Sequence, residues 1–342
     1  MIMSQLKLTA CGNIRTLVII LLAMAVLSTS ASAECTACTF VDNWIKGMIN
    51  GFFPDNSPTD QESASGASSA SLEVKSATSE GSPQNEGALS NVMLVNVSGV
   101  DKNDVVLDAS ENPKSYIPGA IHISYLDFID DNNTPSLKTP PELARILGEA
   151  GIARSDSVVV YGECLPCGGG PSTSTYVYWM LRYLGHDKVK VLDGGIDAWT
   201  RAGMPVQNSS SVRPAATYSP ALRPELYATY DYVKSGAAQI VDARSVPEFE
   251  SGSIPGAINI PYDELLDGKM FKEWAGIEDA LRSNLTSDKP VVVYTTTGTK
   301  ASLVWFGLTM MGYDARLYTW RDWIKNNSTR MNTRRINLNT SN

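Results

Sequence analysis

Residues 106–123 read VLDASENPKSYIPGAIHI, and residues 240–260 repeat this stretch as IVDARSVPEFESGSIPGAINI. The repeat continues downstream, because the string VVVY occurs at 158–161 and again at 291–294, each time before a glycine-containing loop and an apolar helical segment. A repeat of this length indicates a duplicated domain rather than a solenoid. The two units close with matching pairs, Gly185 and Gly312 after the helical segments and Trp199 and Trp323 at the end.

The two VVVY runs show no polar alternation, which is typical of parallel strands buried on both faces. Strands that alternate with helical segments indicate an α/β sheet covered by helices. We therefore predict two α/β domains, each with a mostly parallel central sheet and helices on both faces. In such sheets ligands bind in the loops beyond the carboxyl ends of the strands, so the loops after Tyr161 and Tyr294 are the candidate sites.

The repeat sets the domain boundaries. It places the first domain at residues 92–206 and the second at 224–327, and the connector 207–223 between them is rich in Asn, Ser, Pro and Arg. Residues 54–91 are rich in Ser, Gly, Asn, Asp, Glu and Pro, so we expect a flexible low-complexity linker there. Residues 328–342 form a polar tail.

Residues 1–33 have the pattern of a secretory signal peptide. A positively charged start precedes an apolar run at 17–27, and the small residues ASA at 31–33 match a signal-peptidase site. The apolar run is shorter than the roughly 20 residues of a membrane-spanning helix. We therefore predict cleavage after Ala33 and a secreted or extracytoplasmic protein, with an uncleaved N-terminal membrane anchor as the alternative.

Residues 34–53 combine a cysteine pair with an amphipathic stretch. Cys35 and Cys38 are followed by FVDNWIKGMINGFF at 40–53, in which the apolar residues recur at helical spacing. We interpret this stretch as a short helix that covers an apolar patch of the body. Contact of residues 40–53 with a membrane surface is the alternative.

Charge and motifs exclude several classes of function. The net charge of −8 argues against a nucleic-acid surface, because phosphate binding depends on Lys and Arg. No P-loop motif is present, and we expect no cofactor. His122 and His186 belong to no Cys-His or Ser-His-Asp arrangement, so we interpret both as structural.

The repeated motifs resemble those of the rhodanese sulfurtransferases. They are an Asp-Ala pair near a strand, Ile-Pro-Gly-Ala-Ile and Val-Val-Val-Tyr before a loop and helix, each present in both units, and a closing Gly-Gly-x-x-x-Trp in the first unit. The tandem arrangement, over about residues 92–325, is similar to that of the thiosulfate and 3-mercaptopyruvate sulfurtransferases. The resemblance implies a cysteine that takes sulfane sulfur from a small donor, holds it as a persulfide and passes it to a thiol or other nucleophilic acceptor.

This chemistry has physical requirements that the loops can be tested against. The nucleophile must be a thiolate, and amide N–H groups at a helix N-terminus must stabilise its charge. Glycine helps, because the loop must adopt positive φ to direct successive amides inward.

The loop of the second domain, 295–300 (TTTGTK), departs from the family pattern. Thr295 stands where the resemblance places the cysteine, although Gly298 is retained. A threonine hydroxyl cannot form a persulfide, so we predict that this domain does not transfer sulfur. Lys300 stands where an active loop often has arginine, and we predict that it binds substrate.

The loop of the first domain, 162–173 (GECLPCGGGPST), carries two cysteines. Counting from the strand puts Gly162 at the nucleophile position. Counting back from the helix gives another answer. Thr295 lies 17 residues before Gly312, the glycine that follows its helix, and Gly168 lies the same 17 residues before the equivalent Gly185. The loop therefore has about six extra residues on its strand side, and we predict Cys167, next to Gly168, as the nucleophile.

The residues after Cys167 favour an anion-binding cradle. Three glycines precede Pro171, which suits a first helical turn, and hydroxyl side chains follow as helix caps. We predict that Cys164 acts as a resolving thiol, because it can attack the sulfur held on Cys167. The predicted substrate-binding residues of this loop are Gly168, Gly169, Gly170 and Ser172, with Thr173 as a further cap.

The four cysteines left after signal removal also allow other interpretations. The pairs Cys35/Cys38 and Cys164/Cys167 can form disulfides, as an even cysteine count in an exported chain suggests. A four-cysteine zinc site is another alternative, but 125 residues separate Cys38 from Cys164, far beyond zinc-ribbon spacing. We therefore predict no metal.

Three functions follow from these observations. The leading prediction is an exported sulfurtransferase that acts through a Cys167 persulfide. The alternatives are a non-catalytic binding module with two degenerate loops, and a protein whose Cys164-x-x-Cys167 motif exchanges electrons between thiols and disulfides.

Overall fold

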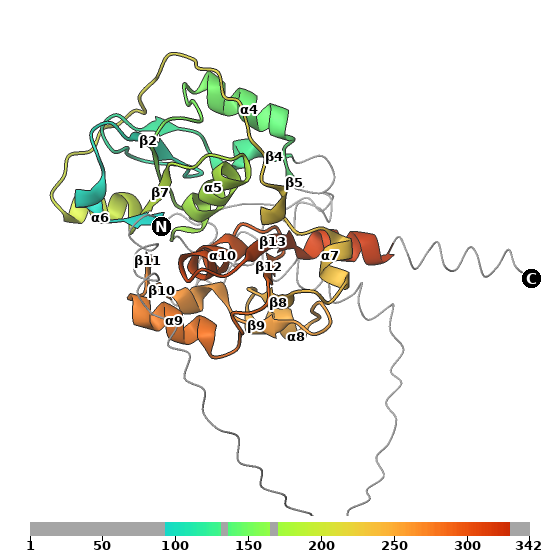
Figure 1. Ribbon diagram of the computed structural model, residues 1–342. Coiled ribbons are helices and arrows are strands. Elements are labelled where there is room, and N and C mark those ends of the chain that lie inside the picture. Colours follow the sequence, from blue (N-terminus) through green and yellow to red (C-terminus); the bar gives the residue numbers. More distant parts are fainter. Residues whose placement is uncertain (1–92, 131–135, 165–169, 329–342) are drawn as a thin grey trace, which may run out of the picture. The chain divides into compact units, whose positions relative to one another are not determined.

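The computed structural model describes residues 93–130, 136–164 and 170–328 (Figure 1). The signal peptide, the cysteine-containing segment 34–53 and the linker 54–91 were predicted for residues outside these ranges. All described residues belong to one of the two compact units of the chain, residues 78–342. None of their helices is both long enough and apolar enough to cross a membrane.

The first domain is built on a parallel sheet of five strands in the order β1-β7-β6-β2-β3. Val158 and Val160 of the central strand face one apolar cluster, and Val159 and Tyr161 face another. Burial on both faces explains why this strand has no polar alternation. The strands are β1 (Leu94–Val95), β2 (Val105–Asp108), β3 (Ile121–His122), β6 (Val158–Tyr161) and β7 (Val189–Leu192).

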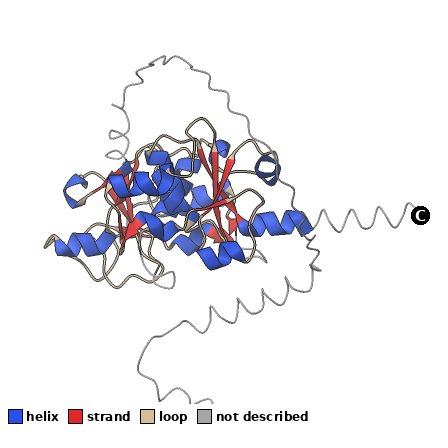
Figure 2. Ribbon diagram, turned by 90° about the horizontal axis from the view of Figure 1, so that it is seen from below, coloured by secondary structure: helices blue, strands red, loops and turns tan. Residues whose placement is uncertain are grey.

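Helices cover both faces of this sheet (Figure 2). Helices α4 (Pro140–Glu149) and α5 (Ser172–Tyr183) bury their apolar residues against one face, and α6 (Gly195–Arg201) buries Trp199 against the other. An antiparallel hairpin of β4 (Ile129–Asp130) and β5 (Ser136–Leu137) lies before α4.

The second domain repeats this plan around a parallel sheet in the order β13-β12-β8-β9. Val291 and Val293 face one apolar cluster, while Val292 and Tyr294 face another. The strands are β8 (Gln239–Asp242), β9 (Ile258–Asn259), β12 (Val291–Thr295) and β13 (Ala315–Thr319), and the helices are α7 (Tyr230–Lys234), α8 (Val246–Glu250), α9 (Trp274–Arg282) and α10 (Ala301–Met310). A hairpin of β10 (Leu266–Asp267) and β11 (Met270–Phe271) precedes α9.

The repeat is preserved at the level of single hydrogen bonds. In the first domain the Tyr161 hydroxyl accepts a hydrogen bond from the Ile117 amide at 3.1 Å. In the second domain the Tyr294 hydroxyl accepts one from the Ile254 amide, also at 3.1 Å. Each tyrosine ends a VVVY strand, and each isoleucine begins an Ile-Pro-Gly-Ala motif. The predicted fold class, two α/β domains with parallel sheets covered by helices, is confirmed.

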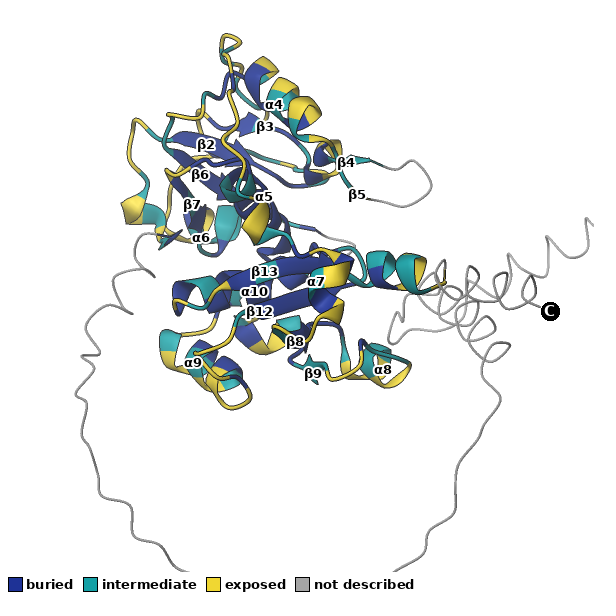
Figure 3. Cartoon of the chain, turned by 45° about the vertical axis from the view of Figure 1, so that its right-hand side comes forward, coloured by how far each residue is buried: buried dark blue, intermediate teal, exposed yellow. Residues whose placement is uncertain are grey.

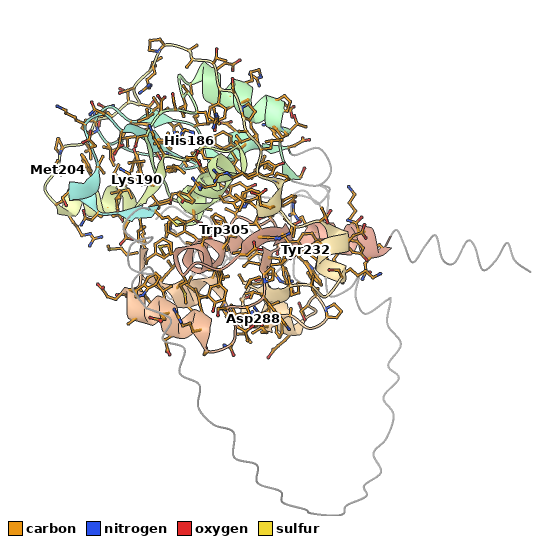
Figure 4. The ribbon with its side chains drawn as sticks, viewed as in Figure 1. His186, Lys190, Met204, Tyr232, Asp288 and Trp305 are labelled. Carbon is orange, nitrogen blue, oxygen red and sulfur yellow. The ribbon has the colours of Figure 1, made fainter. Side chains whose placement is uncertain are left out.

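The two domains meet through α5 and α10, which are buried almost all round (Figure 3). The hydroxyl oxygens of Thr175 and Ser302 lie 2.7 Å apart at the crossing. Further along, the ring of Tyr178 packs edge-on against Phe306, and Trp305 lies beside them on α10 (Figure 4). One apolar cluster therefore runs through both domains.

The connector 207–223 packs along the first domain. The Ala221 amide donates to the Leu184 carbonyl at 2.9 Å, at the end of α5. The buried His186 contacts the Asp156 carbonyl through Nε2 at 2.8 Å and the Tyr218 hydroxyl through Nδ1 at 3.3 Å. These contacts account for His186 as a structural residue.

The equivalent glycines Gly185 and Gly312 make a matched test of this packing. Both have positive φ, 78° and 82°, but a β-carbon on Gly185 would lie 2.1 Å from the Ala221 carbonyl oxygen, whereas one on Gly312 meets nothing within 4 Å. We expect Gly312→Ala to cost about 1 kcal/mol through backbone strain, and Gly185→Ala to cost about 3 kcal/mol or more. Urea unfolding measures both; equal losses would contradict the connector's position.

Candidate functional site

The two candidate loops approach the domain interface together, because each runs directly into one of the crossing helices. The Ser302 hydroxyl in the first turn of α10 donates to the Ser172 carbonyl in the first turn of α5 at 3.3 Å. The N-terminus of a helix carries a partial positive charge and unpaired amide donors. Both loops thus end at helix N-termini that lie side by side.

The loop of the second domain forms an amide cradle, and a hydroxyl occupies it. Thr295 Oγ1 accepts hydrogen bonds from the Gly298 amide at 3.2 Å and from the Ala301 amide at 3.3 Å. Gly298 has φ of +91°, a conformation that other residues rarely adopt. The cradle therefore has the geometry that would stabilise a thiolate, but the oxygen in it cannot carry a sulfane sulfur.

Lys300 lies beside this cradle and is held by an aromatic residue. Its Nζ donates to the Tyr262 hydroxyl at 2.8 Å and lies 4.3 Å from the centre of the same ring. A pocket next to it is lined by Lys300, Thr295, Tyr262 and, from the first domain, Tyr125. The substrate-binding role of Lys300 stays a prediction.

Arg244, which lines the same pocket, is bound to its own domain. The guanidinium donates to both carboxylate oxygens of the buried Asp242, at 2.6–3.2 Å, and to the Gly252 carbonyl at 2.7 Å. It also lies 4.5 Å from the centre of the Trp320 ring. Although burial acts in the opposite direction, the hydrogen bond to Asp242 raises the pKa of Arg244 further above its ordinary value, so the side chain remains charged.

The first domain has no room for a side chain at the position that matches Thr295 when counted from the strand. A β-carbon on Gly162 would lie 2.8 Å from the Ala109 carbonyl carbon, the Ser110 nitrogen and Thr173 Oγ1. The backbone end of β2 thus fills the space that the threonine side chain has in the second domain. A cysteine side chain would therefore not fit at position 162.

The start of α5 carries two buried hydroxyls without a partner. Ser172 Oγ and Thr173 Oγ1 have no hydrogen-bond partner within the part of the chain that the structure describes. The prediction that they cap the helix is wrong, because α5 begins at Ser172 and Pro171 precedes it as the N-cap without a side-chain cap bond. Both hydroxyls lie instead in the first turn, next to Gly170 at the end of the loop.

Cys164 is buried at the entry to the same loop. Its Sγ lies 3.8 Å from the Tyr125 hydroxyl, and the Glu163 amide before it donates to Ser110 Oγ at 3.1 Å. Burial raises the pKa of Tyr125, as does the nearby Glu111, so its hydroxyl stays protonated. Cys164 is disulfide-bonded.

The other predicted residues of this site lie outside the described residues. They are Cys167, Gly168 and Gly169 of the loop and Cys35 and Cys38 near the N-terminus. Among the residues that the structure does describe, no group of three or more His, Cys, Asp or Glu side chains could hold a metal ion.

Sequence analysis missed two residues at this site. Tyr125 comes from the segment after β3, and its aromatic character gave no sign that its hydroxyl would lie near Cys164. Lys269 comes from the β10–β11 hairpin of the second domain, more than a hundred residues from the loop that it contacts through Glu163. Only a contact between distant parts of the chain reveals either one.

Comparison with known proteins assigns both halves to one family. The model of the rhodanese-like domain matches twice, at residues 98–202 and 227–323, which together make up more than half of the chain. The "Putative thiosulfate sulfurtransferase 1" of Mycobacterium bovis is 29% identical over 227 residues, covering 59% of this chain and 78% of the relative. The 3-mercaptopyruvate sulfurtransferase of Escherichia coli is 27% identical over 237 residues, covering 63% and 82%.

Solved structures agree with this assignment. The crystal structure of a 3-mercaptopyruvate sulfotransferase from Escherichia coli aligns with a TM-score of 0.60 at 23% identity, covering 67% of this chain and 99% of that one. At this identity the likeness shows the fold alone. A structure of EanB, in which ergothioneine is covalently linked with a cysteine persulfide, aligns at 26% identity with a TM-score of 0.58, covering 66% of this chain and 63% of that one.

Substitution of Thr295 tests the cradle of the second domain. Thr295→Val leaves the Gly298 and Ala301 amides without an acceptor, and we expect a loss of about 1–3 kcal/mol in the free energy of unfolding. Thr295→Ser keeps the oxygen and should cost less than about 1 kcal/mol. Sulfurtransfer rates of both variants, and of Thr295→Ala, should stay within a few-fold of wild type. A collapse of activity in the stably folded Thr295→Ser variant would show that this loop takes part in the chemistry.

Proposed function

The chain belongs to the rhodanese-like family, and we propose that it is a sulfurtransferase in which only the first domain carries sulfur. The second domain keeps the fold and an amide cradle, but Thr295 occupies that cradle. The loop of the first domain has two cysteines, three glycines and the N-terminus of α5 behind it. Two of the relatives are 3-mercaptopyruvate and thiosulfate sulfurtransferases by name.

A single observation carries this proposal. The described end of the first-domain loop meets α5 with two buried hydroxyls that have no partner among the described residues, Ser172 Oγ and Thr173 Oγ1. Buried polar groups are normally hydrogen-bonded, because leaving one unpaired costs about 1–3 kcal/mol. An anion held at the start of α5 would accept from them and from the helix N-terminus. In the second domain the Ala301 amide, at the equivalent start of α10, already donates a hydrogen bond to Thr295 Oγ1.

The proposed reaction has two steps. In the first, the Cys167 thiolate attacks the sulfane sulfur of a small donor; the donor bond to that sulfur breaks, its leaving group departs with the electron pair, and a Cys167 persulfide remains. In the second, a thiol or other nucleophilic acceptor attacks the outer sulfur, and the thiolate is regenerated. Amides at a helix N-terminus lower the pKa of a thiol and so favour the reactive thiolate.

Cys164 offers a second route out of the persulfide. Its thiolate attacks the inner sulfur of the Cys167 persulfide, a Cys164–Cys167 disulfide forms, and hydrosulfide leaves with the electron pair. Two equivalents of an external thiol then reduce the disulfide. The disulfide-bonded state of Cys164 in the structure is compatible with this route.

The disulfide-bonded state of Cys164 also favours a second candidate function, which is exchange of electrons between thiols and disulfides without sulfane sulfur. A buried cysteine next to a C-x-x-C partner and a helix N-terminus suits redox exchange as well as persulfide chemistry. The two functions differ in whether sulfane sulfur ever resides on the protein.

Variants of single cysteines test the proposal. Cys167→Ser should lower cyanide-dependent thiocyanate formation by roughly three orders of magnitude or more, because it removes the nucleophile. Cys164→Ser should still form the first persulfide but turn over more slowly. Cys38→Ser, in the N-terminal pair, is the matched control and should behave as wild type.

Three results would contradict parts of this scheme. Loss of the persulfide in Cys164→Ser alone would mean that Cys164 is the nucleophile. No thiocyanate formation by the wild type, together with reduction of disulfide substrates, would establish the redox function instead. Absence of both activities would leave a binding module.

We further propose that the protein acts outside the cytoplasmic membrane after cleavage following Ala33. The charged start, the apolar run at 17–27 and the ASA tripeptide support this location. N-terminal sequencing of the mature protein should begin at Glu34. Recovery of residues upstream of 31 would indicate a retained anchor.

A further inference from the structure

The two domains differ at the residue that follows the Asp-Ala pair after their equivalent strands. This residue is Arg244 in the second domain and Ser110 in the first. The backbone shows that the two positions are equivalent, because the Ser110 amide donates to Asp108 Oδ1 at 2.9 Å and the Arg244 amide donates to Asp242 Oδ1 at 3.0 Å. The first domain therefore keeps the aspartate but lacks the guanidinium that binds it in the second.

This difference leaves the carboxylate of the first domain incompletely bound. Asp108 is fully buried, yet its Oδ2 has no hydrogen-bond partner among the described residues. The same oxygen of Asp242 accepts from Arg244 Nη2 at 2.6 Å. His122 Nδ1 lies 3.9 Å from Asp108 Oδ2, too far for a hydrogen bond, and the nearby hydroxyl of Tyr161 does not bind this oxygen either. Buried polar groups are normally hydrogen-bonded, so this oxygen indicates a missing donor.

Three neighbours surround the guanidinium of Arg244 in the second domain. It lies 5.5 Å from the centre of the Tyr294 ring, donates to the Gly252 carbonyl at 2.7 Å and binds Asp242. Tyr294 ends a VVVY strand, and Gly252 stands two residues before the isoleucine of the Ile-Pro-Gly-Ala motif. These positions locate the equivalent space in the first domain.

That space is a cavity in the first domain. Its walls include Ser110, the tyrosine of the first VVVY strand, Tyr161, and Ser115, which stands two residues before the isoleucine of the first Ile-Pro-Gly-Ala motif. The cavity volume of about 310 Å³ lies at the lower end of the range of small-molecule sites, about 300–1,000 Å³. The place that an arginine side chain fills in the second domain is thus large enough for a small ligand.

The charged side chains on the cavity wall do not exclude a cation. Glu163 and Asp197 line the cavity together with Lys269, whose Nζ lies within 3.3 Å of both carboxylates. Lys114 also lines it, and its side chain is exposed. These four side chains together are neutral, so the charge that decides the sign of the ligand is the carboxylate behind the wall.

That carboxylate favours a planar cation with several donors. Burial raises the pKa of Asp108, although hydrogen bonds from Ser110 act in the opposite direction. A buried carboxylate is costly unless a cation is paired with it. In the second domain one guanidinium binds both a carboxylate and a backbone carbonyl. Its rigid, planar set of N–H groups suits two such acceptors, whereas an ammonium group lacks this geometry.

We propose that this cavity binds a small organic guanidinium cation, which takes the place of the missing arginine side chain. Its N–H groups donate to Asp108 Oδ2 and to the Ser115 carbonyl, as Arg244 donates to Asp242 and Gly252. Asp108 is covered in the structure, so side chains of the wall must shift for the cation to reach it, as is common on binding. No cysteine takes part, so the site does not depend on the function proposed above.

Ligand-observed NMR titrations of the full-length protein test the site. The probe is methylguanidinium, and the control probes are methylurea, its neutral counterpart of the same shape, and methylammonium. Methylguanidinium should bind at least about tenfold more tightly than either control, because charge-assisted hydrogen bonds to a buried carboxylate are strong. Asp108→Asn, which removes the charge but keeps an acceptor for the Ser110 amide, should weaken methylguanidinium binding by a similar factor. Asp101→Asn, at an exposed aspartate of the same domain, should leave it unchanged.

Ser110→Arg supplies the guanidinium from the chain itself. This variant should no longer bind methylguanidinium, and its melting temperature should rise by at least about 2 °C, because the new side chain pairs with Asp108. Adding Asp108→Asn should remove that rise. Equal binding of methylurea overturns the proposal, and so does methylguanidinium binding that survives Ser110→Arg or a lower melting temperature of that variant. Since Asp108→Asn adds no bulk, it remains informative if Ser110→Arg unfolds.

Discussion

The contact between α5 and α10 is the constraint on which the rest of the molecule depends. Each helix follows a candidate loop, and the Thr175 and Ser302 hydroxyls meet where the helices cross. Because both helices are buried almost all round, their crossing fixes the two loops at one interface and joins the cores of the two domains. A helix such as α10, whose residues are almost all apolar, can be stable only inside such a shared core.

The two domains share this fold but differ in the loops that follow Tyr161 and Tyr294. In the second domain the Thr295 hydroxyl oxygen accepts hydrogen bonds from the amides that would stabilise a thiolate. In the first domain the end of β2 leaves no space for a side chain at Gly162, and the loop that follows is longer than its counterpart in the second domain. The second domain still reaches that loop through Lys269. The duplicated domains thus differ at the equivalent loops: the first carries two cysteines, and the second carries a threonine in an amide cradle.

The sequence predicted the fold well because its signals are local and occur twice. Buried VVVY strands, the Ile-Pro-Gly-Ala turns and the glycines after the helices each have a direct physical cause. The packing at Gly162 leaves no space for a cysteine side chain there, so the position found by counting from the strand is unsuitable for the nucleophile. The start of α5 was misplaced, because Ser172 and Thr173 suit both a cap and a first turn. Tyr125 and Lys269 could not be predicted, since their roles come from contacts between residues far apart in the chain.

The central claim is that sulfane sulfur resides on the loop of the first domain. The most direct measurement is mass spectrometry of the Cys164→Ser variant, which cannot release the persulfide sulfur by forming a disulfide. The variant is reduced, incubated with thiosulfate or 3-mercaptopyruvate, blocked with an alkylating agent and digested. The account predicts one added sulfur atom on the peptide that contains Cys167, and none on the peptide with Cys35 and Cys38. Added sulfur on the N-terminal peptide, or on neither, would contradict it.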